Sequence, residues 1–419
     1  MTDNIETASI QAAIDEAAAV GGGIVRIAPG VHRTGSLRLR SFVELHLESG
    51  ARLEFVPDPS LYPVIDASWE GAPAKIHQPC IFADGEEGVA VTGLSTIDGG
   101  GEFWWNTVRA GEELGGARPT LISFRHSTRV TIRDVVLENS PAWTVHPYRC
   151  DDVRISGVRI KNPADSPNTD GIDPESCRNV RIIDCHIDVG DDCIAIKAGT
   201  EASSADPAPC ENVVIAGCTM LAGHGGVVIG SEMSGGVRGV VISDCVFDGT
   251  DRGVRLKTRR GRGGIVEDLR ISNIVMRNVA VPFVFNPFYF CGPEGKLPRV
   301  SDRNPLPVDA GTPRIRRVFI SNVSATDVTS CAGFISGLPE MPFEDITITD
   351  VSIGFAADPT PSVPAMAFGI EDMAAAGFYI DFVKNSRIEG VSLSGLVGDA
   401  IIGGAGVEGL IAEVATYGN

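Results

Sequence analysis

Two copies of one short pattern, Val130-Thr-Ile-Arg-Asp-Val135 and Val153-Arg-Ile-Ser-Gly-Val158, decide the fold. In each copy apolar and polar residues alternate, and then Asp or Gly follows, residue types that tolerate a left-handed backbone conformation. Alternation with a period of two is typical of a half-buried β-strand. Each copy therefore predicts two short strands joined by a tight bend.

Further copies of this pattern run along most of the chain. They begin at Val89, Val180, Val213, Val240, Leu269, Val318 and Ile346, with a weaker copy at Ser386. No helical stretch long enough to connect the parallel strands of an α/β fold separates the copies, which excludes that class. An all-β, right-handed parallel β-helix fits best, because each coil can stack on the one before it. A β-propeller is the alternative, but its blades need roughly 40–50 residues each, and most copies start closer together.

The start of the chain predicts a short amphipathic helix. Within Thr7–Val20, Ile10 and Ile14 lie at helical spacing, and a run of glycines ends the pattern. We expect residues 5–23 to cap the first coil, because an uncovered end coil would offer its core and backbone edges to other chains. The whole chain, residues 1–419, is expected to form a single catalytic domain.

Two longer gaps between copies, residues 97–130 and 276–318, are expected to be loops beside a cleft, where functional residues often gather. Trp104-Trp105 lies in the first gap and Phe288-Tyr289-Phe290 in the second. These aromatic residues either wall the cleft or, in the case of the tryptophans, cover the flank of the β-helix. Residues 360–419 are expected to supply the last coils and a C-terminal cap.

Composition bounds the partners and the location of the protein. The chain carries a formal net charge of −19, which disfavours binding to nucleic acid or to an anionic membrane. No segment approaches the ~20 consecutive apolar residues of a membrane helix, and Met1-Thr2-Asp3-Asn4 lacks the start of a signal peptide. We therefore expect a cytoplasmic protein. A trimmed chain with an added methionine would look the same, which keeps a periplasmic or secreted location open. No apolar stripe marks the outward positions, so we expect a monomer.

The cysteine pattern argues against disulfides and metal sites. Cys185, Cys218 and Cys245 occupy positions where other copies carry Val or Ile, so they are expected to be small buried apolar residues. No cysteine and histidine pattern with zinc spacing occurs, and no glycine-rich phosphate loop leads from a strand into a helix. We therefore expect neither a cofactor nor a metal.

Four short islands between residues 168 and 258 hold the side chains with catalytic chemistry. They are Asn168-Thr169-Asp170, Gly190-Asp191-Asp192, Gly223-His224-Gly225 and Arg255-Leu256-Lys257-Thr258. Each alone has an ordinary explanation, since Asp-Asp is common at turns and Arg-x-Lys on a strand is usually solvated. Their order and their spacing of one coil plus a loop predict that they share one face of the β-helix.

The first two islands predict acid–base chemistry. Coils stack ~4.8 Å apart, so Asp170 should lie beside the Asp191-Asp192 pair. Carboxylates held this close do not all ionise independently, which leaves a proton donor next to a base, as glycosidic hydrolysis requires. Arg255 and Lys257 are two residues apart and point the same way on a strand, which suits a carboxylate-bearing sugar.

A run of cations surrounds the last island. It comprises Arg252, Arg255, Lys257, Arg259, Arg260 and Arg262. The run is either a solvated basic loop or the place where an otherwise acidic protein gathers positive charge for an acidic polysaccharide.

With these motifs in this order, the chain resembles the polygalacturonase-like glycoside hydrolases, family 28. The family signature runs N-T-D, (G/Q)-D-D, G-H-G and R-I-K, and this chain differs in having Leu256 in place of the isoleucine. The similarity covers about residues 5 to 355 and is marked in four longer stretches that resemble the bacterial branch. These stretches are Trp143–Pro147, Gly171–Cys177, Gly190–Gly199 and Gly223–Glu232.

The resemblance implies a right-handed parallel β-helix that hydrolyses α-1,4-linked galacturonic acid in pectin with inversion. By position, Asp191 would be the general acid, and Asp170 and Asp192 would hold and activate the water. His224 would support the acid. An inverting site should separate the acid and base carboxyl groups by ~6.5–9.5 Å.

The resemblance also assigns substrate-binding residues. Arg255 and Lys257 would bind the galacturonate carboxylate, Tyr289 would match a tyrosine of the family's cleft, and Asn168 would bind substrate from the first island. His146 would bind substrate too, and together with the two long insertions it favours exo action on short oligogalacturonides.

Three alternatives stay open. A pectate-lyase-like β-helix would use the aspartate cluster as Ca²⁺ ligands, although Gly-His-Gly and Arg-x-Lys have no role in that scheme. A non-catalytic carbohydrate-binding β-helix would function without Asp191. Within the family, the substrate is homogalacturonan, xylogalacturonan or rhamnogalacturonan.

Overall fold

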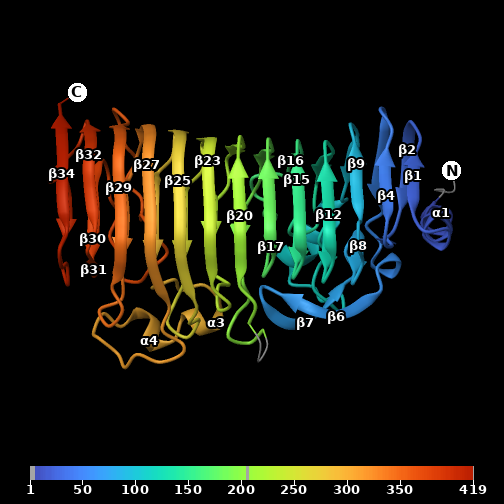
Figure 1. The fold of residues 1–419 in the computed structure, drawn as a ribbon, viewed down its shortest axis with the longest axis horizontal. Helices are drawn as coiled ribbons and strands as arrows, with labels where there is room; N and C mark the ends of the chain where they lie inside the picture. Colours follow the sequence, from blue (N-terminus) through green and yellow to red (C-terminus); the bar gives the residue numbers. More distant parts are fainter. Residues whose placement is uncertain (1–4, 204–206, 419) are drawn as a thin grey trace. The chain divides into compact units, whose positions relative to one another are not determined.

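The computed structural model describes residues 5–203 and 207–418, and the chain forms two compact units. Each unit is a stack of parallel strands (Figure 1). The repeats that were expected in one domain are thus distributed over two compact units.

Unit 1 comprises Met1–Ala195 with Cys210–Val214. Its elements are α1 (Thr7–Ala19), β1 (Gly23–Ile27), β2 (Gly30–Thr34), β3 (Leu37–Arg38), β4 (Val43–Leu47), β5 (Ala51–Phe55), η1 (Pro59–Leu61), β6 (Val64–Trp69), β7 (Ala72–His77), β8 (Ile81–Asp84), β9 (Ala90–Gly93), β10 (Thr96–Asp98), α2 (Gly101–Ala110), β11 (Ile122–Arg125), β12 (Thr128–Arg133), β13 (Val136–Glu138), β14 (Val145–Tyr148), β15 (Asp151–Ser156), β16 (Arg159–Lys161), β17 (Arg178–Ile183), β18 (His186–Asp188), β19 (Asp192–Ile196, whose last residue belongs to unit 2) and the start of β20 (Cys210–Ala216).

Three ladders of parallel strands build unit 1. One joins β1, β4, β9, β12, β15 and β17, a second joins β2, β5, β10, β13, β16 and β18, and a third joins β3, β8, β11 and β14. Successive copies of the pattern pair in register, so Val130 lies beside Val153, and Val153 beside Val180. The chain visits the ladders in turn, which is the layout of a parallel β-helix, and the predicted fold class is confirmed.

Unit 2 comprises Ile196–Pro209 with Ile215–Asn419. Its elements after β20 are β21 (Thr219–Leu221), β22 (Gly225–Ile229), β23 (Val237–Asp248), β24 (Arg252–Lys257), β25 (Ile265–Arg277), β26 (Val281–Asn286), α3 (Gly292–Gly295), α4 (Pro298–Ser301), β27 (Arg314–Val328), β28 (Cys331–Ser336), β29 (Phe343–Phe355), β30 (Ala376–Asp381), β31 (Val383–Lys384), β32 (Arg387–Ser394), β33 (Ile401–Gly403) and β34 (Ile411–Tyr417). One ladder joins β23, β25, β27, β29, β32 and β34, and another joins β22, β24, β26, β28, β30 and β33.

The bend residues of the repeat adopt the conformation that their side chains predicted. Asp134 and Asp184 in unit 1 have φ values of 65° and 57°, and Asp244 and Asn273 in unit 2 have 57° and 58°. Asp and Asn are the residues other than glycine that most readily accept this left-handed region. In unit 1 the bend separates two short strands, as predicted, whereas in unit 2 it lies within one long strand, Asp244 in β23 (Val237–Asp248) and Asn273 in β25 (Ile265–Arg277). The bend is therefore encoded locally.

The predicted N-terminal cap is confirmed. α1 begins at Thr7 and packs on β1, β3 and β4, and Ile10 and Ile14 are its buried residues. In Figure 1 the helix lies beside β1 and β4, where it covers the first coil of unit 1.

The two gaps expected to be loops are only partly irregular. Residues 97–130 contain α2 and the coil strand β11, and residues 276–318 contain the coil strand β26 with two short helices. The strands were missed because they carry no copy of the alternating pattern. Trp104 of α2 is fully buried, with its ring 5.4 Å from that of Tyr62 and 5.2 Å from that of His77. This tryptophan covers the flank and does not wall a cleft.

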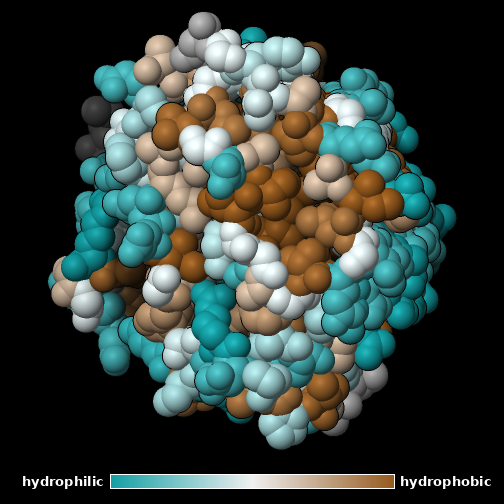
Figure 2. Space-filling view, turned by 90° about the vertical axis from the view of Figure 1, so that its left-hand side faces the viewer, coloured by the Kyte–Doolittle hydropathy of each residue, from teal (hydrophilic) through white to brown (hydrophobic). Residues whose placement is uncertain are grey.

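The last strand of unit 2 has no cover among the described residues, which differs from the C-terminal cap expected within residues 360–419. β34 pairs with β32 on one side, and Tyr417 is 60% exposed. Figure 2 shows apolar residues gathered on this end of unit 2. In this part of the chain, Val397 is 68% exposed and Ile411 of β34 is 44% exposed.

The cysteines are free thiols, and nine of the ten are buried. Cys185, Cys218 and Cys245 are among the buried ones, as the repeat predicted. Burial raises the pKa of the Cys331 thiol to about 12, which is consistent with an apolar role. Within the described ranges, no helix has the length and apolarity to cross a membrane.

Candidate active site

Three carboxylates of unit 1 lie together, as the spacing of the first two islands predicted. One oxygen from each of Asp170, Asp191 and Asp192 lies within 4.8 Å of the others. Asp170 and Asp192 are buried, whereas Asp191 is half-buried. Burial and the charge of Asp192, followed by other nearby carboxylates, raise the pKa of the Cys193 thiol. Carboxyl groups gathered in this way can serve as proton donor and as proton acceptor in one reaction.

Backbone pairing between neighbouring coils sets this geometry. The Gly171 amide donates to the Asp192 carbonyl oxygen at 3.0 Å, and the Thr144 amide donates to that of Asp170 at 2.9 Å. A Cβ on Gly171 would collide with the carbonyl oxygen of Cys193, so only glycine allows the two coils to approach. The Asp191 Oδ1 accepts a hydrogen bond from the Asp192 amide at 2.9 Å, which orients its carboxylate.

The separation of the carboxylates differs from the expectation for an inverting site. Acid and base carboxyl groups of inverting glycosidases typically lie 6.5–9.5 Å apart, whereas the nearest oxygens here come within 4.8 Å. Two of the aspartates are adjacent in the chain, and the third lies one coil away at a spacing of about 4.8 Å. The nearest carboxylate oxygens are therefore closer together than the expected separation of about 6.5–9.5 Å.

Gly190→Ala is expected to disturb the cluster. A Cβ at Gly190 would lie 2.6 Å from the carbonyl oxygen of Pro163 and 2.8 Å from that of Ser166, both backbone atoms. Overpacking of this kind costs about 1–3 kcal/mol, and the resulting shift displaces Asp191. We expect a lower melting temperature and roughly tenfold lower kcat, since about 1.4 kcal/mol corresponds to tenfold. Calorimetry and initial rates measure both.

The matched control is Gly354→Ala, where the nearest atom is the flexible Ser394 hydroxyl oxygen at 3.3 Å. It should leave stability and rate almost unchanged. Equal behaviour of the two variants would contradict the steric role assigned to Gly190.

Asn168 of the first island is held by a buried arginine that carries no motif. The Arg118 guanidinium donates to Asn168 Oδ1 at 2.7 Å and to the carbonyl oxygens of Pro141 and Pro167, both at 2.8 Å. Burial lowers the pKa of Arg118 to about 10, and the charges of Glu70 and Asp170 limit the fall. Arg118 thus orders the loop that leads into Asp170.

His146 lies inside unit 1 as one member of a buried side-chain pair. Its Nε2 is 2.9 Å from Glu175 Oε2, and both side chains are almost fully buried. The His146 ring contacts that of Trp143 edge to face at 4.9 Å, and Trp143 stacks on Trp69 at 5.9 Å. A role of His146 in substrate binding stays a prediction.

A pocket of ≈ 520 Å³ in unit 1 adjoins Asn168. Its walls come from the end of β6, from the end of α2 and from residues 112–118, which follow α2 and are bridged to β7 between Ile76 and Ala117. The Arg118 guanidinium and the Trp69 ring, 5.5 Å apart, both line it. The lining also includes Thr107, Glu112, Glu113 and Leu114.

In unit 2 the fourth island and an aromatic residue form a cationic site. The Tyr289 ring lies 5.6 Å from the Arg255 guanidinium and 5.4 Å from the Lys257 Nζ. Arg255 and Lys257 share one face of β24, as their spacing predicted, and each is less than a tenth exposed. The insertion 276–318 therefore does bring Tyr289 to the two cations. Such a site can bind a carboxylate through charge-assisted hydrogen bonds.

A buried carboxylate balances this positive charge. Glu232 Oε2 lies 3.0 Å from Lys197 Nζ, and both side chains are less than a tenth exposed. Burial alone would raise the pKa of Glu232, but the charges of Lys197, Arg262 and Lys257 outweigh it and bring the pKa to about 2. Glu232 therefore stays ionised and fixes the surrounding cations.

The basic run does not act as one cluster. Arg259 and Arg262 bind Glu201, and Arg260 forms a two-pronged pair with Glu340. These arginines tie loops together, so the run is neither a solvated loop nor a uniform surface for an acidic polymer. Arg255 and Lys257 are the members that meet Tyr289.

His224 of the third island belongs to unit 2 and is exposed. It follows Gly223, whose carbonyl oxygen accepts a hydrogen bond from the Asp251 amide at 2.9 Å, and it immediately precedes β22. Its expected support of Asp191 stays a prediction.

Comparisons with known proteins identify the family to which the chain belongs. A model described as glycosyl hydrolases family 28 matches residues 70–362. A probable polygalacturonase from Vitis vinifera is 35% identical over 84% of this chain and 72% of its own length. An endo-polygalacturonase from Pectobacterium carotovorum subsp. carotovorum is 32% identical over 71% of this chain and 75% of its own. The chain belongs to glycosyl hydrolases family 28.

Solved structures agree with this family-28 assignment. An exopolygalacturonase from Thermotoga maritima is 30% identical, with a TM-score of 0.75 over 87% of this chain and 86% of its own. A polygalacturonase from Erwinia carotovora ssp. carotovora is 26% identical, with a TM-score of 0.67 over 84% of this chain and 91% of its own. The chain is thus a glycosidase, as expected. Plant and bacterial relatives both match, so the bacterial branch stays a prediction.

Sequence reasoning missed some residues that shape this family-28 site. Lys197 and Glu232 lie in stretches that already resembled the family, but nothing local marked them as a pair. Arg118 lies in a stretch without any motif, and its contacts are all more than twenty residues away. Only the tertiary structure reveals it.

Proposed function

We propose that this family-28 hydrolase cleaves α-1,4-galacturonosyl linkages of pectin-derived oligosaccharides. The observation that carries the proposal is the cluster of Asp170, Asp191 and Asp192, with oxygens within 4.8 Å. The relatives named polygalacturonase support galacturonic acid as the sugar. The site of Arg255, Lys257 and Tyr289 supports it as well, because it offers two cations to a sugar carboxylate.

In the proposed reaction, Asp191 donates its proton to the glycosidic oxygen as the bond to the anomeric carbon breaks. Asp170 and Asp192 hold a water molecule, whose oxygen bonds to the anomeric carbon while a carboxylate takes its proton. Asp191 is assigned as the acid because it is the most exposed of the three and the resemblance gives it that role. His224 supports the acid.

We assign an inverting outcome on the resemblance to the family, although the nearest carboxylate oxygens are closer than the usual inverting separation. Proton NMR of the first product formed distinguishes the outcomes. A β-configured reducing end appearing first means inversion, and an α-configured one means retention, which would instead match the short spacing.

Exo action on short oligomers is the proposed mode. The pocket of ≈ 520 Å³ in unit 1 supports it, because a walled pocket in the size range of small-ligand sites accepts a chain end better than a passing polymer. The similarity to the exopolygalacturonase from Thermotoga maritima is consistent with this mode. A cytoplasmic location is part of the proposal, since long pectin does not enter cells.

A digest of homogalacturonan and of short galacturonate oligomers in EDTA tests the function. We expect reducing ends to rise while ultraviolet absorbance stays flat, with galacturonate monomer as the early product. Mixed oligomers as early products would contradict exo action. Rising absorbance, or loss of activity in EDTA, would replace hydrolysis by a Ca²⁺-dependent lyase reaction. No product would redirect the search to rhamnogalacturonan and xylogalacturonan.

A further inference from the structure

The sheet face that carries the cations of unit 2 becomes apolar one strand beyond β24. The parallel register places Val284 of β26 beside Arg255, Phe334 of β28 beside Val284, and Tyr379 of β30 beside Phe334. Paired residues in register share a face of the sheet. The Phe334 and Tyr379 rings stack at 4.9 Å with 9° between their planes. A charged face therefore gives way to an apolar one.

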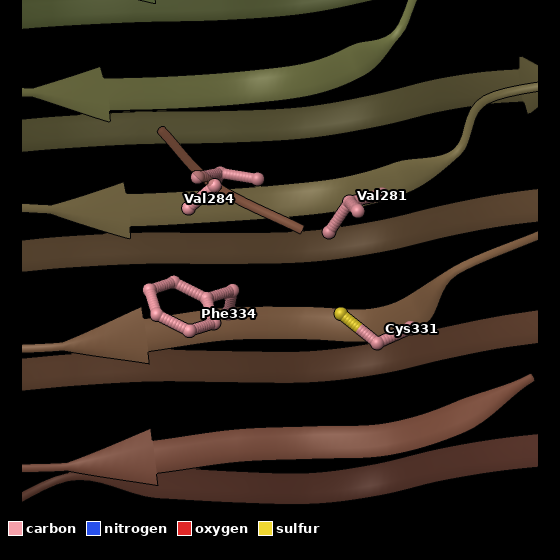
Figure 3. Packing of buried hydrophobic residues seen from close by; sticks show 5 residues of the cluster. Val281, Val284, Cys331 and Phe334 are labelled. Carbon is pink, nitrogen blue, oxygen red and sulfur yellow. The ribbon is translucent and has the colours of Figure 1, made fainter. Parts of the chain in front are cut away.

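A hairpin from the C-terminal part of the chain covers this apolar face. Ser362 and Met373 close it by exchanging backbone hydrogen bonds of 3.1 and 3.0 Å. Its Ala365 belongs to a buried cluster whose other members lie on the sheet, and its Ile370 and Met373 pack against that cluster. Figure 3 shows four members of that cluster on adjacent strands. They are Val281, Val284, Cys331 and Phe334.

The hairpin is fastened to β24, which carries the cationic site, and to its neighbour β26. Arg252 of β24 donates to the carbonyl oxygen of Pro364 at 3.0 Å and to that of Val363 at 2.7 Å. Asn286 of β26 donates to the carbonyl oxygen of Met366 at 3.0 Å. Asn286 is the register partner of Lys257, so the hairpin begins one strand from the cation.

The tip of the hairpin reaches the aromatic side of the same site. Phe368 packs against Phe290 with ring centroids 4.9 Å apart, and Phe290 directly follows Tyr289 in the chain. Phe368 remains 43% exposed, so it presents an aromatic surface to solvent at this point. The hairpin therefore borders the cationic site both along the sheet and beside Tyr289.

We propose that the hairpin 362–373 is the element that limits substrate length, by ending the binding face one strand beyond Arg255 and Lys257. When these cations hold one galacturonosyl unit, the next unit in the direction of β26 and β28 finds no exposed sheet to bind, because the hairpin covers it. The inference rests on the proposed function and names a specificity determinant for it. All but the first residue of the hairpin lie beyond the range matched by the family model, residues 70–362.

Excision of the hairpin tests the inference. Residues 363–372 are replaced by Asn-Gly, since paired strand ends accept a two-residue turn and Ser362 and Met373 already pair. Both proteins carry Asp191→Asn, so that oligomers of two to eight galacturonates are bound but not consumed, and calorimetry gives Kd against length. We expect the parent affinity to stop rising at a short length. The affinity of the excised variant should rise about tenfold further as the oligomer lengthens. This is the effect of about 1.4 kcal/mol from a further sugar contact.

Arg252→Gln provides a second variant in case the excised protein does not fold. It removes both hydrogen bonds to residues 363–364 and keeps the apolar cover. Arg316→Gln is its control, because Arg316 pairs with Glu267 on another ladder of unit 2. Arg252→Gln should shift the length dependence in the same direction, and Arg316→Gln should not shift it.

Identical length profiles for the parent and the folded variants would overturn the inference, since the hairpin would then only cover the core. This outcome is distinct from failure of the proposed function. If the parent chain neither hydrolyses nor binds galacturonate oligomers at any length, the substrate assignment itself is wrong.

Discussion

Replacing Asp191 by Asn is expected to lower kcat about a thousandfold, within the 10²–10⁴ range of general acid catalysis. The amide keeps the shape of the side chain and can still accept the hydrogen bond from the Asp192 amide at 2.9 Å. It has no proton to give to the leaving oxygen, so bond cleavage loses its acid. KM should change little, because the proposed carboxylate-binding residues are untouched. Initial rates on a trimer of galacturonate measure both parameters.

Asp184→Asn is the matched control for this variant. Asp184 is an exposed bend residue of the repeat in unit 1 with φ of 57°, a conformation that Asn also adopts readily. Its activity and melting temperature should equal those of the parent. An Asp191→Asn enzyme that retains more than about a tenth of the parent kcat would remove Asp191 from the role of general acid and direct attention to Asp170 and Asp192.

Replacing Glu232 by Gln is expected to cost about 3 kcal/mol of unfolding free energy at neutral pH. Its partner Lys197 is 4% exposed, and removal of one member of a buried pair leaves an uncompensated charge, which typically costs about 3–5 kcal/mol. The pKa of Glu232 implies a free energy of similar size. It falls from 4.5 to about 2 on folding, and each pKa unit is worth about 1.4 kcal/mol.

The same pair predicts a particular acid dependence. A carboxyl group whose pKa is lowered by folding stabilises the protein fully above its unfolded value and loses this contribution as the pH falls through its folded value. For Glu232 this window runs from about pH 4.5 down to about pH 2. Denaturant titrations at several pH values should therefore show the free-energy difference between parent and Glu232→Gln shrinking as the pH falls through this window.

Glu408→Gln serves as the control for this prediction. Glu408 lies 3.3 Å from Lys384 but is 68% exposed, and surface pairs contribute about 0–1 kcal/mol. If both variants lose equally little stability, the buried charges of unit 2 do not have the importance assigned to them.

The repeating coil could be predicted from the sequence because its cause is local. Alternation of apolar and polar residues selects strands, and Asp or Asn at the bend accepts a left-handed φ, as at Asp134 and Asn273. Stacking such coils brings residues one repeat apart to neighbouring strands, so the meeting of Asp170 with Asp191 and Asp192 followed from spacing alone. The direction of Arg255 and Lys257 followed from the two-residue period of a strand.

Contacts between residues distant in the chain could not be predicted in this way. The run of cations from Arg252 to Arg262 looks uniform in sequence, yet its members contact several different partners. Arg252 binds carbonyl groups of residues 363–364, Arg260 binds Glu340, and Arg255 meets Tyr289. The coil strand β11 and the helix α2 were likewise hidden, because neither repeats the alternating pattern.

The sequence by itself determined the coil, the bend conformation and the identity of the three carboxylates, because each depends on residues within one repeat or one repeat apart. The tertiary structure alone decided which charges are structural and which can meet a substrate. It placed Arg118 on Asn168, paired Glu232 with Lys197, and laid residues 362–373 over the face beside Lys257. The physical reason is that neighbours in space decide whether a charge is paired within the protein or accessible to a substrate. The insertions that supply those neighbours lie outside the repeat.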